Sequence, residues 1–214
     1  LRVHGQDVSE AKRLFFVAID SYEGDLEKLE HVDDKILLVK PSPARLMELA
    51  PGVPEDLIAR ALASSGLGMI RTLGGAIFKY NREAVAQRIA KLYKTMNIKR
   101  GILNVNFIVI AALGGGTGSG LAPHIGLMLR RMYPESLIVG CFILPDSNET
   151  IFNRGNALGA LKELKLLSSI PDIHSPFDLI LLLGRKVADR YRDEEIEIVL
   201  SRFLVDLGYV PSLS

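Results

Sequence analysis

The sequence predicts an α/β fold in three layers, a mainly parallel sheet with helices on both faces, and three observations support this. Apolar runs of strand length, rich in β-branched and aromatic residues, recur along the chain. Segments with apolar residues at helical spacing alternate with them, which is typical of parallel βαβ units. A glycine-rich turn joins one run directly to a helix. The predicted strands are 13–20, 35–39, 107–113, 137–144 and 178–183.

Composition excludes several classes of protein. The chain has 214 residues, so one domain is the simplest expectation and two small ones are the alternative. Its net charge of +1 predicts no nucleic-acid partner. Its single cysteine, Cys141, lies in an apolar run and predicts a buried thiol in a reducing cytoplasm. The sequence has neither an apolar run of membrane-spanning length nor a signal-peptide pattern, so we expect a cytoplasmic protein without direct membrane insertion.

Six helices are expected, one of them with a clear start. Asn81 is predicted to cap a helix over 81–96, in which Val85, Ile89 and Leu92 form an apolar stripe. The first twelve residues are weakly helical in pattern, and the prolines of 40–54 predict loops and short turns. The other expected helices are 26–32, 54–64, 121–133 and 150–169, with a last one at 193–207.

The glycine-rich turn between the strand at 107–113 and the following helix is the main candidate site. A strand, such a turn and a helix N-terminus bring backbone N–H groups together on an anion. Glycines let the backbone approach phosphate oxygens, and serine or threonine adds hydroxyl donors. The predicted phosphate ligands are Gly114, Gly115, Gly116, Thr117, Gly118 and Ser119.

The type of phosphate loop follows from its spacing. No lysine follows the glycines, so the Walker pattern fails, and no register satisfies G-x-G-x-x-G. The stretch Gly114-Gly115-Gly116-Thr117-Gly118-Ser119-Gly120, preceded by Leu113, resembles the signature loop of the tubulin/FtsZ superfamily of GTPases. The resemblance implies a GTP-binding domain of that superfamily, GTP/GDP and Mg²⁺ as ligands, and self-assembly into head-to-tail filaments. It also implies a role in cell division or cell shape, with possible cell-division or membrane-tethering partners.

Further site residues come from the same resemblance. A second glycine-rich loop at 66–75 resembles the loop that closes over the γ-phosphate, which gives phosphate roles to Gly66, Gly68 and Arg71. The alternative is a surface loop with a solvated arginine. Asp20 ends a predicted strand and matches a loop near the metal and phosphates; the alternative is a solvated turn acid.

The resemblance also assigns the ribose and the base. Glu149, spaced from Pro145, matches the ribose-binding glutamate, and the arginine expected beyond it is displaced by one, to Arg154; a helix-capping turn is the alternative. Tyr191 and Glu195 match the residues that stack on guanine and read its edge. Alternatively, Glu195 is one of several acids that stabilise the N-terminus of a helix. Gly184 occupies the place of the base-contacting asparagine.

The resemblance covers only part of the superfamily's length. We expect residues 1–214 to form a GTP-binding domain that lacks the first strand and first nucleotide loop, starts within the first helix, and ends at a central helix near 190–208. The activation domain and its acidic catalytic loop are not expected, so no catalytic residue is assigned, and GTP hydrolysis is expected to be completed between subunits of a polymer.

Two other functions compete with this one. A degenerate, non-polymerising relative acting as a structural or regulatory partner is favoured by Gly184 and the missing segments. A Rossmann-type dinucleotide-dependent oxidoreductase would use Asp146, at the end of the strand after the loop helix. The four histidines show no metal-ligand spacing, and only His124, near the loop, is close to a candidate site.

Overall fold

The computed structural model describes residues 2–3, 6–7, 15–64, 66–100, 105–170, 174–184 and 202. The expected helix at 193–207 and the candidate base ligands Tyr191 and Glu195 therefore lie outside the described residues. The described chain falls into two compact units, one that includes the residues up to Leu37 and one formed by Leu38–Gly184. The mainly parallel α/β class is confirmed within these units.

The first unit begins with a short antiparallel pair, β1 (Arg2–Val3) and β2 (Gln6–Asp7), so the weak helix predicted there is wrong. Strand β3 (Val17–Asp20) then pairs in parallel with β4 (Asp34–Leu37). The helix between them, α2 (Glu23–Glu27), lies earlier than predicted. Acids at its first turn favour the positive end of the helix dipole, which explains the earlier start.

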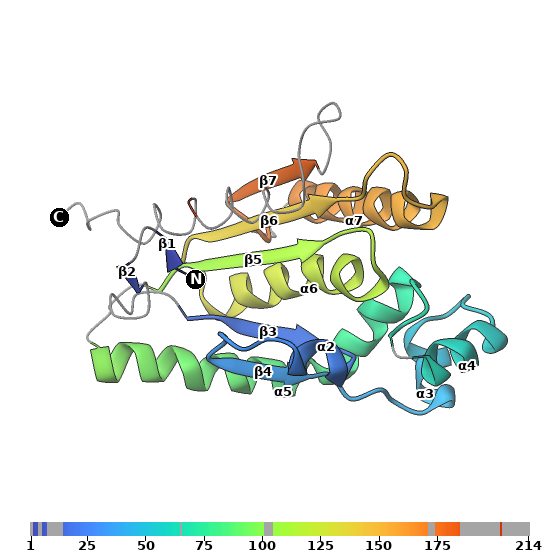
Figure 1. Ribbon diagram of the computed structural model, residues 1–214, viewed down its shortest axis with the longest axis horizontal. Helices are drawn as coiled ribbons and strands as arrows, with labels where there is room; N and C mark the ends of the chain where they lie inside the picture. The colour runs from blue at the N-terminus through green and yellow to red at the C-terminus, as the bar shows by residue number, and fades with distance from the viewer. Residues whose placement is uncertain are drawn as a thin grey trace. The chain divides into compact units, whose positions relative to one another are not determined.

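The sheet of the second unit is parallel and has the order β5-β6-β7. Its strands are β5 (Phe107–Ala112), β6 (Ile138–Leu144) and β7 (Leu179–Gly184), and Figure 1 shows their arrows pointing the same way. Only the central strand β6 is buried along most of its length. β5 and β7 each expose a large apolar residue, Ile110 in β5 and Leu182 in β7.

Three long helices pack in this unit. α6 (Gly116–Met132) contacts β5, β6, α5 (Arg71–Arg100) and α7 (Ile151–Ser169). The start of α7 is confirmed, because the Thr150 hydroxyl accepts a hydrogen bond from the Asn153 N–H. α6 begins five residues earlier than predicted, inside the glycine run, because its glycines pack on neighbouring backbone rather than forming an extended loop.

The start predicted for the long helix at Asn81 is wrong. α5 begins at Arg71, and Asn81 is a buried residue in its interior. The Asn81 amide accepts from the Val39 N–H at 2.9 Å and donates to the Val39 carbonyl at 2.8 Å. The side chain that suggested a cap therefore satisfies the backbone of a distant segment instead.

The proline-rich segment holds one unpredicted helix. α3 (Pro43–Leu49) has Ser42 as N-cap, with its hydroxyl accepting from Arg45 N–H, and a proline at its first position. Proline is favoured there because a first-turn N–H has no partner within the helix. α4 (Glu55–Ala63) follows where the sequence predicted it.

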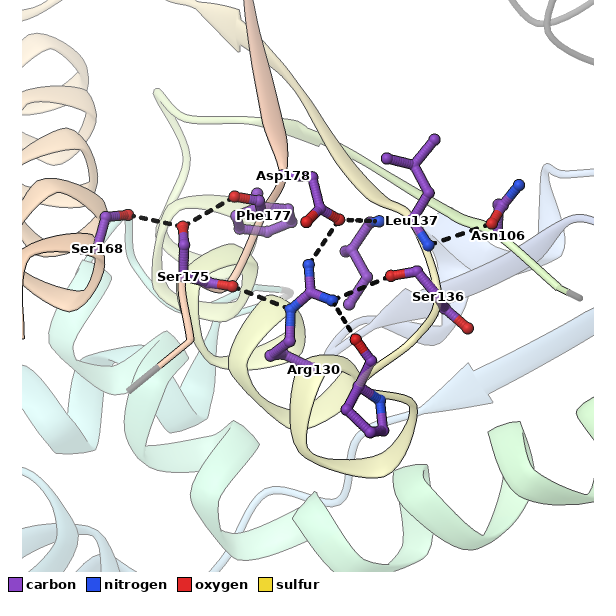
Figure 2. A network of polar contacts seen from close by, with 10 residues as sticks. Asn106, Arg130, Ser136, Leu137, Ser168, Ser175, Phe177 and Asp178 are labelled. Atoms are coloured by element: carbon purple, nitrogen blue, oxygen red, sulfur yellow. Dashed lines mark hydrogen bonds and ion pairs between the residues drawn. The ribbon is translucent and has the colours of Figure 1, made fainter. Parts of the chain in front are cut away.

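The amino ends of β6 and β7 are tied to α6 by one arginine (Figure 2). Arg130 is 8% exposed; it donates to the carbonyls of Pro134 at 2.8 Å, Ser136 at 3.0 Å and Ser175 at 3.1 Å. It also pairs with Asp178 at 2.5 Å. Burial alone would raise the pKa of Asp178, but the Ile138 N–H and Arg130 together hold it below its usual value.

No helix among the described residues is long and apolar enough to span a membrane.

Candidate functional site

The signature loop is a tight connection between β5 and α6. β5 ends at Ala112, Gly115 is the N-cap of α6, and no described side chain caps it. The N–H groups of a helix's first turn have no acceptor within the helix, so they are available to an anion. A β-carbon on Gly115 would meet no described atom within 4 Å. The strand, turn and helix predicted around these glycines are confirmed, and Gly115 faces open space.

The other glycines of the loop serve close packing. A β-carbon on Gly116 would lie 2.9 Å from the Ile70 nitrogen, and one on Gly118 would lie 2.5 Å from the Ala112 carbonyl oxygen. A β-carbon on Gly120 would lie 2.6 Å from the Gly75 nitrogen. These positions require glycine because backbone lies where a side chain would begin, a reason that holds with or without a ligand.

The two hydroxyl candidates differ in environment. Ser119 is fully buried, and its hydroxyl donates to the Gly115 carbonyl within the first turn of α6. Thr117 is partly exposed on the same turn. The Ser119 hydroxyl thus stabilises the turn itself, and Thr117 is the better placed of the two to meet a ligand.

The second predicted loop is shorter than expected and contacts the first. Residues 71–75 belong to α5, so only 66–70 form a turn. Gly68 and Met69 have positive φ angles of 57° and 60°, and the Ile70 N–H donates to the Leu67 carbonyl at 3.0 Å. The Met69–Ile70 backbone packs on Gly116. The structure therefore brings the Gly66–Gly68 segment beside the signature loop.

The predicted phosphate ligand Arg71 has a protein partner. Its guanidinium pairs with Glu163 of α7, and its side chain passes Gly159. Burial lowers the Arg71 pKa, and its Nε atom is buried with no hydrogen-bond partner among the described residues. Glu163 would therefore compete with a phosphate for the Arg71 guanidinium.

The candidate ribose ligand Glu149 lies against the signature loop. Its carboxylate accepts from the Asp146 N–H at 2.9 Å and from the Asn153 amide at 2.8 Å. A β-carbon on Gly114 would stand 3.3 Å from the same carboxylate. Arg154 is exposed on the first turn of α7. The structure thus places the Glu149 carboxylate, a hydrogen-bond acceptor, directly beside the signature loop.

Sequence reasoning missed two asparagines on α7. Asn153 orients Glu149, and Asn156 donates to the carbonyls of Met69 at 2.8 Å and Gly114 at 3.1 Å. Asn153 and Asn156 are three residues apart, which places both on one face of the helix. That spacing is the only feature of the sequence that could have indicated a shared role for them.

Asp20 belongs to the first unit, where its carboxylate accepts from the N–H groups of Ser21 and Tyr22 and forms a turn at the end of β3. The described part of the chain contains no group of histidine, cysteine and acidic residues arranged to hold a metal ion.

The comparisons with known proteins agree with this geometry. A model of the tubulin/FtsZ family GTPase domain matches residues 70–170. Over 157 residues, 72% of this chain, the sequence is 29% identical to the tubulin-like protein CetZ of Pyrococcus abyssi. CetZ1 from Haloferax volcanii, solved as a GDP-bound monomer, shares the fold with a TM-score of 0.62 and 25% identity over 92% of this chain. The predicted resemblance to the tubulin/FtsZ superfamily is confirmed in sequence and in fold.

A second CetZ structure has the same fold. CetZ2 from H. volcanii, solved as a GTPγS-bound protofilament, has a TM-score of 0.60 and 20% identity and covers 94% of this chain. The chain spans 36% of the P. abyssi relative, 52% of the CetZ1 chain and 50% of the CetZ2 chain. The region matched by the superfamily model contains the signature loop, Glu149 and Asn156, whereas Gly66, Gly68 and Asp20 lie before it.

Proposed function

We propose that the chain binds guanine nucleotides with the N-terminus of α6. The observation that carries this proposal is the open position of Gly115 at the uncapped start of a 17-residue helix. In the proposed complex, N–H groups of the signature loop bind the phosphates and Glu149 binds the ribose. Gly66 and Gly68 line the phosphate side, with Arg71 as a further phosphate ligand if it leaves Glu163. The resemblance further assigns Asp20 to the Mg²⁺ site, and Tyr191 and Glu195 to the base.

The function that follows at the level of the whole protein is filament assembly. CetZ2, a structural neighbour, is described as a GTPγS-bound protofilament. We propose that the whole protein likewise assembles head to tail in the cytoplasm and acts in cell division or cell shape. Hydrolysis would be completed where the next subunit supplies an acidic group that positions the attacking water.

The first test is calorimetric titration of GTP, ATP and NAD with Mg²⁺ into the wild-type chain and the variant Gly115→Val. Gly115 is preferable to Gly116 because its added side chain enters open space, so the variant should keep its thermal midpoint. We expect selective GTP binding and a loss of affinity of at least about tenfold in the variant, equal to one lost charge-assisted hydrogen bond. The matched control is Gly155→Val, at an exposed position of α7 where a β-carbon also meets nothing within 4 Å.

The other outcomes identify the competing functions. Tight NAD binding would mean that the loop serves a dinucleotide-dependent enzyme. Absence of binding by any nucleotide would favour the degenerate relative, the function that Gly184 at the end of β7 already suggests. GTP-dependent sedimentation of the whole protein then tests assembly, and binding without sedimentation would leave a non-polymerising nucleotide-binding protein.

A further inference from the structure

One side chain joins the two segments of the candidate site. The Asn156 amide nitrogen donates to the Met69 carbonyl at 2.8 Å and to the Gly114 carbonyl at 3.1 Å. A carboxamide NH₂ has two hydrogens, and here each is used on a different loop. Met69 and Gly114 are 45 positions apart in the sequence, and Asn156 links them through α7 in addition to the direct packing of Met69 and Ile70 on Gly116.

The Gly68–Met69 turn needs such support. Met69 is the single non-glycine with a positive φ among the described residues, and its side chain is 42% exposed. A left-handed conformation is unfavourable for methionine, and an exposed side chain gives little burial to offset it. The turn is held instead through its backbone, by the Asn156 amide and by contact of Met69 and Ile70 with Gly116.

The bond to Gly114 has a direct consequence for anion binding. In a planar trans peptide, the carbonyl of one residue and the N–H of the next point in opposite directions. The Gly114 carbonyl is turned toward Asn156, so the Gly115 N–H points away from α7. Asn156 therefore fixes the direction of an N–H group at the N-cap of α6.

We propose that Asn156 is a positioning residue that locks the Gly68–Met69 turn to the signature loop and so prepares both for a phosphate group. This proposal deepens the nucleotide-binding function and rests on it for its ligand. Asn156 itself does not contact the nucleotide. It couples the two segments, so a ligand that orders the signature loop also orders the turn.

The coupling can be tested first without nucleotide, by hydrogen exchange at two reporter amides. Ile70 N–H is bonded to the Leu67 carbonyl within the turn, and Leu113 N–H is bonded to the Ile143 carbonyl before the loop. We expect Asn156→Leu to accelerate exchange at both amides by roughly tenfold, the value of one or two lost hydrogen bonds. The control, Gln87→Leu, removes an exposed amide of α5 and should change neither rate. Unchanged rates at Ile70 or at Leu113 in Asn156→Leu would overturn the clamp.

The second measurement adds GTP and Mg²⁺. In the wild type, nucleotide should slow exchange at Ile70 and at Leu113 together; in Asn156→Leu it should slow exchange at Leu113 only. Asn156→Asp, which turns a carboxylate toward two carbonyl oxygens, should weaken GTP binding by about tenfold or more, whereas Gln87→Glu should not. A general loss of stability would accelerate exchange throughout the chain and would not separate the two reporters. Protection of Ile70 by GTP in Asn156→Leu would overturn the coupling.

The two proposals fail in different ways. If the wild-type chain binds no guanine nucleotide, the proposed function is contradicted, while the nucleotide-free exchange rates still decide whether Asn156 clamps the turn to the loop. If the wild type binds GTP and Asn156→Leu behaves like Gln87→Leu, the function stands and the positioning role is contradicted.

Discussion

Gly116 packs against the backbone of Ile70 so closely that a β-carbon at Gly116 would lie 2.9 Å from the Ile70 nitrogen. This contact joins the signature loop to the residue that precedes α5, and it leaves no room for a side chain at Gly116. We expect Gly116→Ala to lower the free energy of unfolding by about 1–3 kcal/mol, because backbone must move to admit the methyl group. Chemical denaturation checks this value. Gly115→Ala is the control, and equal losses in both variants would contradict the packing role of Gly116.

Asn81 provides a second stability prediction. It is 7% exposed and bonds both backbone groups of Val39 and the Ile77 carbonyl. Asn81→Asp keeps the acceptor for Val39 N–H but turns a carboxylate toward two carbonyl oxygens. We expect a loss of about 2–3 kcal/mol at neutral pH, since two buried acceptors lose their donor. Urea denaturation measures this loss of unfolding free energy. A loss smaller than that of Asn148→Asp, a change at an exposed residue, would contradict the role of Asn81 in binding these backbone groups.

The Arg130 network predicts an asymmetric pair of variants. Arg130 is buried and serves three carbonyls as well as Asp178, whose side chain is 42% exposed. Arg130→Met should cost about 3 kcal/mol, because several buried acceptors lose their donor, and Asp178→Asn about 1 kcal/mol, because water replaces part of the lost pairing. A double-mutant cycle with both changes measures the pair itself. Equal single costs would show that the carbonyl bonds contribute little.

Acid should weaken the same network. The Asp178 pKa is lowered in the folded chain, so this carboxylate stabilises the fold above its unfolded pKa of about 3.9, and the contribution is lost as the pH falls through the lower folded value. We expect Asp178→Asn to show a shallower fall in unfolding free energy than the wild type below about pH 4. Parallel slopes in the two proteins would contradict a lowered pKa.

His124 predicts a pH effect at milder acidity. Burial, with Lys79 and Arg71 nearby, lowers its pKa to about 4, although Glu163 lies 3.7 Å from Nε2. The Glu163 carboxylate is already paired with Arg71, which limits its pull on the imidazole. The unfolded chain gains a proton as the pH falls through about 6.5, before the folded chain does, so unfolding free energy should fall between that pH and 4 by on the order of 2–3 kcal/mol. His124→Gln should remove that part of the pH dependence; an unchanged curve would contradict it.

Gly155 offers a stabilising change. It is exposed in the interior of α7, and a β-carbon there meets nothing within 4 Å. Gly155→Ala should raise the free energy of unfolding by about 0.5–1 kcal/mol, because alanine loses less backbone entropy in a helix. Thermal unfolding provides the measurement, with destabilisation as the contrary result.

The parts of the fold that depend on neighbouring residues were predictable. Apolar runs form β5, β6 and β7, Thr150 caps α7, and glycines form the turn into α6. Each of these follows from the conformational preference of a few adjacent residues. The superfamily was recognisable for the same reason, because its signature is one continuous stretch.

Residues whose role depends on distant partners were misread or missed. Asn81 has the chemistry of a helix cap, but the backbone of Val39 occupies its amide. Nothing near Arg71 in the sequence indicates that its guanidinium pairs with Glu163 on α7. Nothing near Asn156 in the sequence indicates that it bridges Met69 and Gly114.

The sequence by itself determined that a strand, a glycine turn and a helix form a loop of the tubulin/FtsZ type, because that geometry is local. Only the tertiary structure decided which glycines face open space and which face backbone. A β-carbon at Gly115 would meet nothing within 4 Å, whereas one at the next residue, Gly116, would meet the Ile70 nitrogen. Close approach between segments depends on how α5, α6 and α7 pack together, and no local pattern encodes that packing.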